Sequence, residues 1–238
     1  MEFVRSLQQV QFSEKETFGT RGCDLGKLLV ERIPIPPTFV LTTKAWESFV
    51  IKTGLRYKID FVLKQVDMRN EKTLVNAYNS IRKLIHGMQI PAEIIAEIKE
   101  AYESLGKGAD IDAIMEEESA PNVFMIASPT YIPAAENFEG IIQNAHGLEQ
   151  VILAIKEIYA TAFTPEAIKY QQSIKEKAFS LAVIMQGMPG AIASATAYSS
   201  DPKHPDTVFI HAYKGYTDLR DVVAKDFFHV KKEFLNIT

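Results

Sequence analysis

Glycines and an arginine gather in a short segment near the N-terminus, with a spacing that suits close contact with another group. Gly19, Gly22 and Gly26 follow one another at intervals of three and four residues. Glycine is the residue that accepts a positive φ or a close approach of the backbone to a neighbour. Arg21 lies between the first two glycines and supplies a forked cation. We name residues 18–22 the glycine turn. Its composition predicts that its backbone and the Arg21 cation lie close to a neighbouring group.

The other residue types that could do chemistry show no pattern typical of a catalytic or metal site. The histidines have no metal-ligand spacing; they are His86, His146, His204, His211 and His229. His211 is either a ligand or base, or a packed, hydrogen-bonded side chain. Cys23, the one cysteine, is either a thiolate near a helix start or a small packed side chain. We therefore assign no catalytic residue and no metal ligand.

The elements that would position the glycine turn can be predicted from the residues after it. Asp24 can cap a helix that carries Leu25, Leu28 and Leu29 on one face. Residues 33–37, Ile-Pro-Ile-Pro-Pro, cannot be helical, because each proline fixes φ and lacks an N–H. Residues 38–43 are rich in β-branched and aromatic side chains and predict a strand.

The remaining chain predicts helices first and strands last. Helical spacing runs over residues 45–53 and 57–105, with Pro91 at the start of a helix, and again over 147–163 and 164–174. Residues 123–128 predict a strand, followed by an irregular loop to about 140. Residues 1–17 form a polar lead-in, strand-like near Val10 and Phe12. Four further strand-like runs cover residues 181–188, 193–200, 207–213 and 226–232. The class expected is α+β, a helical N-terminal part packed with a mainly antiparallel sheet.

Composition excludes several classes of protein. The chain has 238 residues and a formal net charge of −4, which does not favour a nucleic-acid partner, because such proteins are usually basic. No apolar run approaches the roughly 20 residues that a membrane helix needs, and the N-terminus lacks the apolar region of a signal peptide. With one cysteine, no disulfide framework can form. We expect a cytoplasmic protein with no membrane partner.

The proline-rich segment at residues 33–37, here called the elbow, and the strand after it resemble a known family. Residues 33–43 are similar to the Ile-Pro-Val-Pro-Pro-Gly-Phe-Val-Val-Thr-Thr segment of the N-terminal nucleotide-binding domain of phosphoenolpyruvate synthase and pyruvate phosphate dikinase. Thr38 and Arg32 stand at family glycines, and Arg21 stands at the family lysine. Further similar segments are residues 158–170, 182–188, 194–202 and 208–218. The resemblance implies one ATP-grasp-like nucleotide-binding domain over residues 1–238, with approximate lobes at 1–120 and 121–238.

The resemblance also implies which residues contact a nucleotide: Gly19, Arg21, Gly22, Ser128, Gln186, Met188, His211 and Asp218. Gln186 and Met188 would line an adenine slot; the alternative is a core strand in which methionine fills a gap. Arg21 would face phosphate; the alternative is a surface charge beside an ordinary turn. Asp218 would face ribose or lie in a solvated loop. Ala127 stands at the family arginine of Val-Arg-Ser-Ser, so a bidentate phosphate clamp is replaced by a methyl group.

The expected cofactor is ATP with Mg²⁺, by resemblance. The family's magnesium ligands belong to an Asp-Ile-Glu-Trp segment beyond the part matched here, so we expect none in this chain. The function implied is the ATP-binding domain of a phosphoenolpyruvate-synthase-like kinase or phosphotransferase. It would pass phosphate to a histidine on another domain and be inactive as an isolated chain. Two alternatives are a degenerate, non-catalytic binding or regulatory domain and a partner of a full-length family enzyme.

Overall fold

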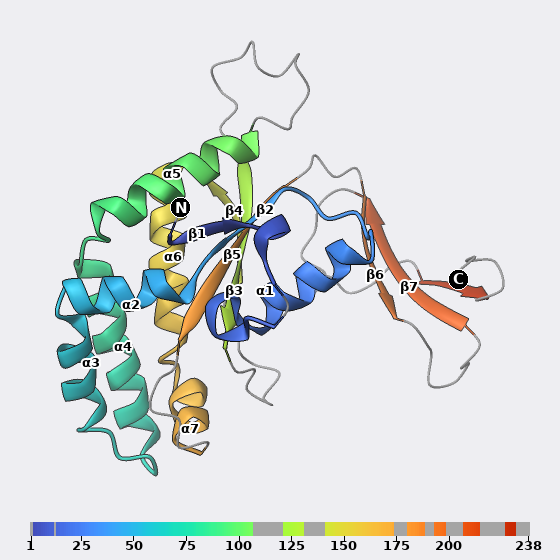
Figure 1. The fold of residues 1–238 in the computed structure, drawn as a ribbon. Helices are drawn as coiled ribbons and strands as arrows, with labels where there is room; N and C mark the ends of the chain where they lie inside the picture. The colour runs from blue at the N-terminus through green and yellow to red at the C-terminus, as the bar shows by residue number, and fades with distance from the viewer. Residues whose placement is uncertain are drawn as a thin grey trace. The chain divides into compact units, whose positions relative to one another are not determined.

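The computed structural model describes residues 2–11, 13–106, 121–130, 141–173, 180–188, 193–198, 207–214 and 227–231. The chain divides into two compact units, Met1–Met188 and Pro189–Thr238. Each unit is built on its own sheet (Figure 1). The expected mixture of helices with a mainly antiparallel sheet is confirmed. The sheet of the first unit joins strands from either side of residue 120, where the sequence suggested a boundary between lobes.

The sheet of the first unit has five strands in the order β1-β2-β5-β3-β4, and each neighbouring pair is antiparallel. The strands are β1 (Val4–Ser6), β2 (Thr38–Leu41), β3 (Asn122–Pro129), β4 (Ile141–His146) and β5 (Leu181–Gly187). The register sets Val40 opposite Ile184 on β5, and Ile126 opposite Ile184 on its other side. β5 is therefore the centre of the sheet, although it is the last of these strands in the chain.

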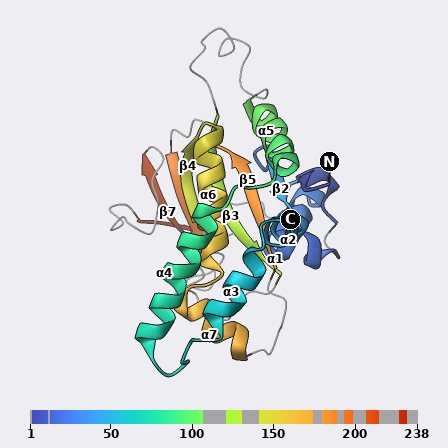
Figure 2. The same ribbon diagram turned by 90° about the vertical axis from the view of Figure 1, so that its left-hand side faces the viewer.

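Different helices cover the two faces of this sheet, because successive side chains of a strand point to opposite sides. Val40, Ala182 and Ile184 pack with Phe18 and Cys23 of α1 (Lys15–Val30). The alternate residues of β3 and β5 enter the main core with all the other helices of this unit. These are α2 (Thr43–Lys52), α3 (Leu55–Leu63), α4 (Glu71–Gly87), α5 (Ala92–Gly106), α6 (Leu148–Thr161) and α7 (Pro165–Ser173). Figure 2 shows α3, α4 and α6 lying alongside one another.

Several sequence predictions need correction at the N-terminus and near residue 140. The strand of the lead-in is Val4–Ser6, followed by the short 3-10 helix η1 (Leu7–Gln9), and Val10 follows that helix in extended backbone; Phe12 lies outside the described residues. Asp24 does not cap a helix, because α1 begins at Lys15 and Asp24 lies within it, paired with Lys27 at 2.9 Å. Residues 131–140 of the expected loop lie outside the described residues, and the strand after them, β4, was not predicted.

The C-terminal end of α1 carries a strained arginine. Arg32 has a φ of 59°, the one positive value at a non-glycine residue in the described part of the chain. Its N–H donates to the carbonyl of Leu29 at 3.0 Å, and the N–H of Ile33 donates to that of Leu28 at 3.0 Å. This pair of bonds is the Schellman motif, in which the left-handed position is usually glycine. The motif thus favours a glycine at residue 32, as the resemblance implies.

Arg32→Gly is expected to raise the free energy of unfolding by about 0.5–1 kcal/mol, because glycine removes the left-handed strain but adds entropy to the unfolded chain. Urea denaturation measures the change. Glu31→Gly is the matched control: its φ of −73° carries no such strain, so that variant should lose about 0.5–1 kcal/mol. Equal effects of the two glycines would contradict the assignment of strain to Arg32.

The second unit contains a three-stranded antiparallel sheet in the order β6-β7-β8. The strands are β6 (Ala193–Tyr198), β7 (Thr207–Lys214) and β8 (Phe227–Lys231), which confirms the three strand-like runs predicted there. The register sets His211 opposite Thr196 on one side and Phe227 on the other. Asp218 lies outside the described residues.

In the described part of the chain, no helix combines the length and the apolar character needed to cross a membrane.

Candidate functional site

Ser128, at the C-terminal end of β3, holds the glycine turn in place. Its Oγ accepts a hydrogen bond from the N–H of Gly22 at 2.9 Å and donates one to the carbonyl of Phe18 at 2.8 Å. The residue is fully buried, so no water competes for these bonds at the hydroxyl. One side chain therefore fixes both ends of the turn against the sheet.

The three glycines satisfy the two requirements predicted from the sequence. Gly19 has a φ of 68° and a ψ of 173°, a combination essentially limited to glycine. A Cβ on Gly19 would lie 2.0 Å from the carbonyl oxygen of Ser128. A Cβ on Gly22 would lie 3.3 Å from Cβ of Phe18, and one on Gly26 would lie 3.3 Å from Cγ1 of Val10. Gly19 thus approaches the sheet more closely than a side chain allows, whereas Gly22 and Gly26 lie in tight contacts that a small shift of the neighbour could relieve.

Arg21 lies in the turn as a partly buried cation with unused hydrogen-bonding capacity. Its Nη1 donates to the carbonyl of Ala127 at 2.8 Å, which orients the guanidinium at the end of β3. A guanidinium has five N–H donors, and no other partner is recorded for Arg21 in the part of the chain that the structure describes. Burial lowers the pKa of Arg21, as expected for a charge removed from water without a counter-ion. The group is suited to an anion that supplies the missing charge.

Gln186 and Met188 lie at the other end of β5. The register pairs Ser128 with Ala182 and Phe124 with Gln186, so Gln186 is four residues, about 13 Å, further along the sheet than Ser128. Gln186 and Ser128 belong to the face covered by α1, because Ala182 and Ile184 lie on that face and side chains alternate. The predicted residues of the first unit therefore form two groups on one face of one sheet.

The groups at this end of β5 already have partners within the chain. Gln186 Nε2 donates to Oγ1 of Thr38 at 3.0 Å, and that hydroxyl donates to the carbonyl of Pro36 at 2.7 Å. The N–H of Met188 donates to the carbonyl of Asn122 at 2.9 Å, so it is not free for a base edge. Thr38 stands at a family glycine by the resemblance, and its contact with Gln186 was not predicted. Strand pairing between distant segments is not visible in local sequence.

Ala127 lies on the opposite face from the glycine turn. Its side chain is fully buried in the main core, among the residues that alternate with Ser128 along β3. An arginine at this position, as the resemblance implies, would extend toward the helices rather than toward Arg21. The alternation of Ala127 and Ser128 was visible in the sequence and could have indicated this.

Burial decides between the two interpretations of Cys23, whereas the two interpretations of His211 stay open. Cys23 is completely buried, and burial is the main cause that raises its pKa, which supports the interpretation as a small packed side chain. His211 belongs to the second unit, where it is placed on β7 by its register alone. Among the described residues, no three His, Cys, Asp or Glu side chains gather in a way that could hold a metal ion.

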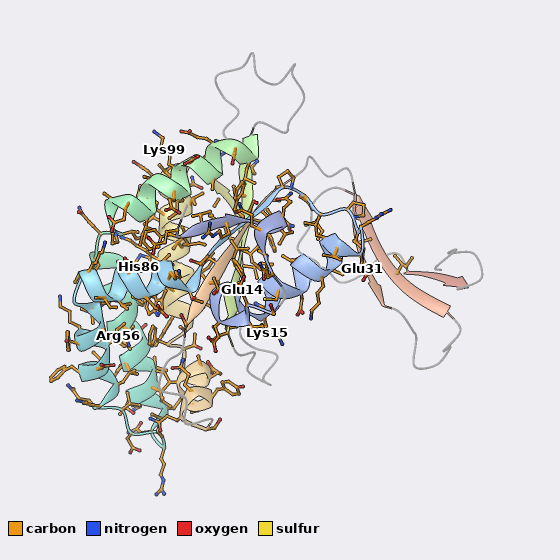
Figure 3. All side chains as sticks on the ribbon, viewed as in Figure 1. Glu14, Lys15, Glu31, Arg56, His86 and Lys99 are labelled. Carbon is orange, nitrogen blue, oxygen red and sulfur yellow. The ribbon has the colours of Figure 1, made fainter. Side chains whose placement is uncertain are left out.

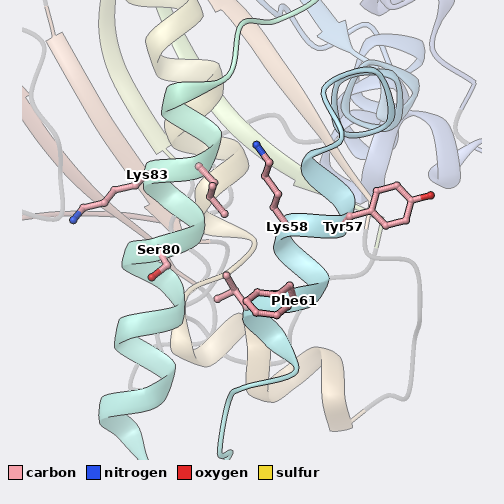
Figure 4. Close-up of a pocket in the computed structure, with 7 residues that line it drawn as sticks. Tyr57, Lys58, Phe61, Ser80 and Lys83 are labelled. Atoms are coloured by element: carbon pink, nitrogen blue, oxygen red, sulfur yellow. The ribbon is translucent and has the colours of Figure 1, made fainter.

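A hollow of about 670 Å³ between α3 and α4 contains none of the predicted site residues. Its lining residues include Lys58 and Phe61 of α3 and Ser80 and Lys83 of α4, all labelled in Figure 4. Tyr57 and Phe61 expose 81% and 66% of their surface. This hollow is an apolar surface feature on the helical face of the sheet, away from the glycine turn.

Comparison with known proteins identifies the fold family. Residues 15–237 match the family model described as the AMP/ATP-binding domain of pyruvate phosphate dikinase. The chain belongs to this family. Over the whole length of this chain, it is 29% identical to a probable phosphoenolpyruvate synthase of Methanocaldococcus jannaschii. Over 99% of this chain, it is 27% identical to the phosphoenolpyruvate synthase of Pseudomonas aeruginosa. A rifampicin phosphotransferase of Bacillus cereus is 24% identical over 84% of the chain.

The AMP/ATP-binding domain corresponds to only part of these relatives. It spans 20% of the archaeal protein, 31% of the Pseudomonas enzyme and 22% of the rifampicin phosphotransferase. The similarity therefore concerns this domain and leaves the remaining domains of the relatives unmatched. The resemblance stated from the proline-rich elbow and the glycine turn is confirmed at the level of the family.

Proposed function

We propose that this chain binds ATP, with the triphosphate at the glycine turn and the adenine near Gln186 and Met188. The observation that carries the proposal is the unfilled donor capacity of Arg21 beside a turn that Ser128 holds rigid. The separation of about 13 Å between the two residue groups suits a ligand with its charge at one end and its base at the other. His211 and Asp218 stay predictions from the resemblance.

We assign the chain, on this basis, as the ATP-binding part of a phosphoenolpyruvate-synthase-like phosphotransferase with an ATP-grasp-like fold. Phosphoryl transfer depends on positioning and on cations that offset charge, and Arg21 supplies one such cation. The phosphate would pass to a histidine of another domain. The described residues do not fit a magnesium site, so Mg²⁺ would take its ligands from outside them. We propose no final acceptor beyond that histidine, because relatives of this domain carry different names.

Arg21→Ala is expected to weaken ATP binding about 10- to 100-fold, because a hydrogen bond to a charged group contributes about 1.5–3 kcal/mol. Titration calorimetry with the full chain measures the affinity. Lys27→Ala is the matched control, since it removes a cation from the same helix that is exposed and already paired with Asp24. Absence of heat with millimolar ATP in the unaltered chain, or an equal loss in both variants, would refute the phosphate contact.

A second candidate function is a non-catalytic nucleotide-binding domain. The observation that favours it is Ala127, whose side chain is buried in the core at the position where the resemblance implies an arginine. In this case ATP binds, and Arg21→Ala still weakens it. No phosphate would reach the phosphohistidine domain of a related enzyme added to the chain. Incubation with radiolabelled ATP and that domain distinguishes the two functions.

A further inference from the structure

A second cavity, of about 620 Å³, lies on the helical face of the first unit. It is bordered by the end of α2, the segment that leads into α5, and α6. Most of its wall is apolar and comes from Ile90, Pro91, Ile95 and Ile152. Cavities of this size are typical of small-molecule sites. The sheet separates it from the glycine turn, because α2, α5 and α6 pack on the face opposite α1.

The cavity contains a buried lysine without an acidic partner. Lys156 on α6 is only 9% exposed and lines the cavity. Its Nζ donates to the carbonyl of His86 at 3.1 Å, in the last turn of α4; Figure 3 labels His86. Within the described residues, no carboxylate lies within 4 Å of this ammonium. An ammonium has three donors, so two remain for another group.

No carboxylate offsets the charge of Lys156, which is balanced only in part by the last turn of α4, the negative end of that helix dipole. Glu157, next in the sequence, is bound to Arg82 at 2.7 Å and to His86 Nε2 at 2.6 Å. Lys52, the other lysine of the cavity, is paired with Glu93. The N-terminus of α5, at Ala92, also borders the cavity and adds the positive end of a helix dipole. Burial of an unpaired charge is unfavourable, and a bound anion would remove that penalty.

We propose that this cavity binds a small aliphatic monocarboxylate, with its carboxylate on Lys156 and its hydrocarbon chain against the isoleucines and Pro91. One charge without a carboxylate partner matches a monoanion, and the apolar wall matches an aliphatic body rather than a bare ion. Burial lowers the pKa of Lys156, and a bound carboxylate would raise it again. The site is independent of the proposed nucleotide site on the other face of the sheet.

The test is calorimetric titration of the full chain with hexanoate, with hexanamide as a neutral ligand of the same shape and with inorganic phosphate as an anion lacking an apolar body. Hexanoate is expected to bind at least about tenfold more tightly than either, equivalent to about 1.4 kcal/mol. This comparison needs no variant. Equal binding of hexanoate and hexanamide, tighter binding of phosphate, or no hexanoate binding at tens of millimolar would each overturn the proposal.

Two variants locate the charge that is responsible. Lys156→Met keeps the length of the side chain and removes its charge, and it should weaken hexanoate at least about tenfold. Lys52→Met removes the lysine that is already paired with Glu93, and it should change affinity less than about threefold. Arg21→Ala should leave hexanoate binding unchanged, so failure here is distinguishable from failure of the ATP site. An equal effect of Lys52→Met and Lys156→Met would assign the anion to the rim and refute a site on Lys156.

Discussion

Replacement of Gly19 by alanine is expected to destabilise the first unit by about 2–6 kcal/mol. Two costs add: a non-glycine residue in this backbone region costs about 1–3 kcal/mol, and overpacking adds about 1–3 kcal/mol. The overlap cannot be relieved by a side-chain rotation, because the new Cβ would lie 2.0 Å from the backbone oxygen of Ser128. Urea denaturation followed by circular dichroism measures the loss, and ATP binding should fall with it.

Gly147→Ala is the matched control for this prediction. Gly147 has a φ of 81° and a ψ of 152°, the same backbone region as Gly19, but nothing lies within 4 Å of its added Cβ. It should therefore show only the backbone cost of about 1–3 kcal/mol. If both variants lost the same stability, the close contact between Gly19 and Ser128 would contribute nothing, and the turn would not be held as described.

Ala127→Arg, which introduces the arginine that the resemblance implies, is expected to cost about 3–5 kcal/mol and to bring no gain in ATP affinity. The side chain of residue 127 enters the main core, and an uncompensated buried charge is destabilising by about this amount. Arg21 lies on the α1 side of β3, where it donates to the carbonyl of residue 127. A guanidinium at position 127 would enter the opposite face and would not reach a phosphate bound by Arg21. Denaturation and calorimetry on the same sample test both statements.

Ala127→Met separates charge from volume at this position. It adds a side chain of similar length without charge, so it should cost only the overpacking term, about 1–3 kcal/mol. An Ala127→Arg variant as stable as the unaltered chain, with tighter ATP binding, would contradict the placement of Ala127. It would mean that β3 can present residue 127 to the glycine turn.

The local elements of the fold were predictable, whereas the pairing of distant segments was not. The elbow at residues 33–37, the strand β2 after it and the helices with apolar spacing follow from residue types within a few positions of one another. The central place of β5 depends on contacts with β2, which pairs Thr38 with Gln186 across 148 residues. β1 has three residues, and neither β1 nor β4 was predicted.

The candidate site was predicted in the same uneven way. The glycines indicated a positive φ or a close approach of the backbone, because few other residues accept either. The role of Ser128 was not visible, because a serine in a strand gives no indication of which loop its hydroxyl will meet. Lys156 lies in an amphipathic helix with no unusual local pattern. Its burial depends on the position of the end of α4, which local sequence does not show. The sequence therefore located the turn but not the groups that hold it.

The bonds from Ser128 to the turn also fix an order of events during biosynthesis. The hydroxyl that shapes residues 18–22 lies 110 residues after Phe18, so at 5–20 residues per second it is synthesised roughly 5–20 seconds later. Until the ribosome releases β3, the nascent glycine segment has no template for its final conformation. The proposed nucleotide site therefore forms only after β3 has joined the sheet.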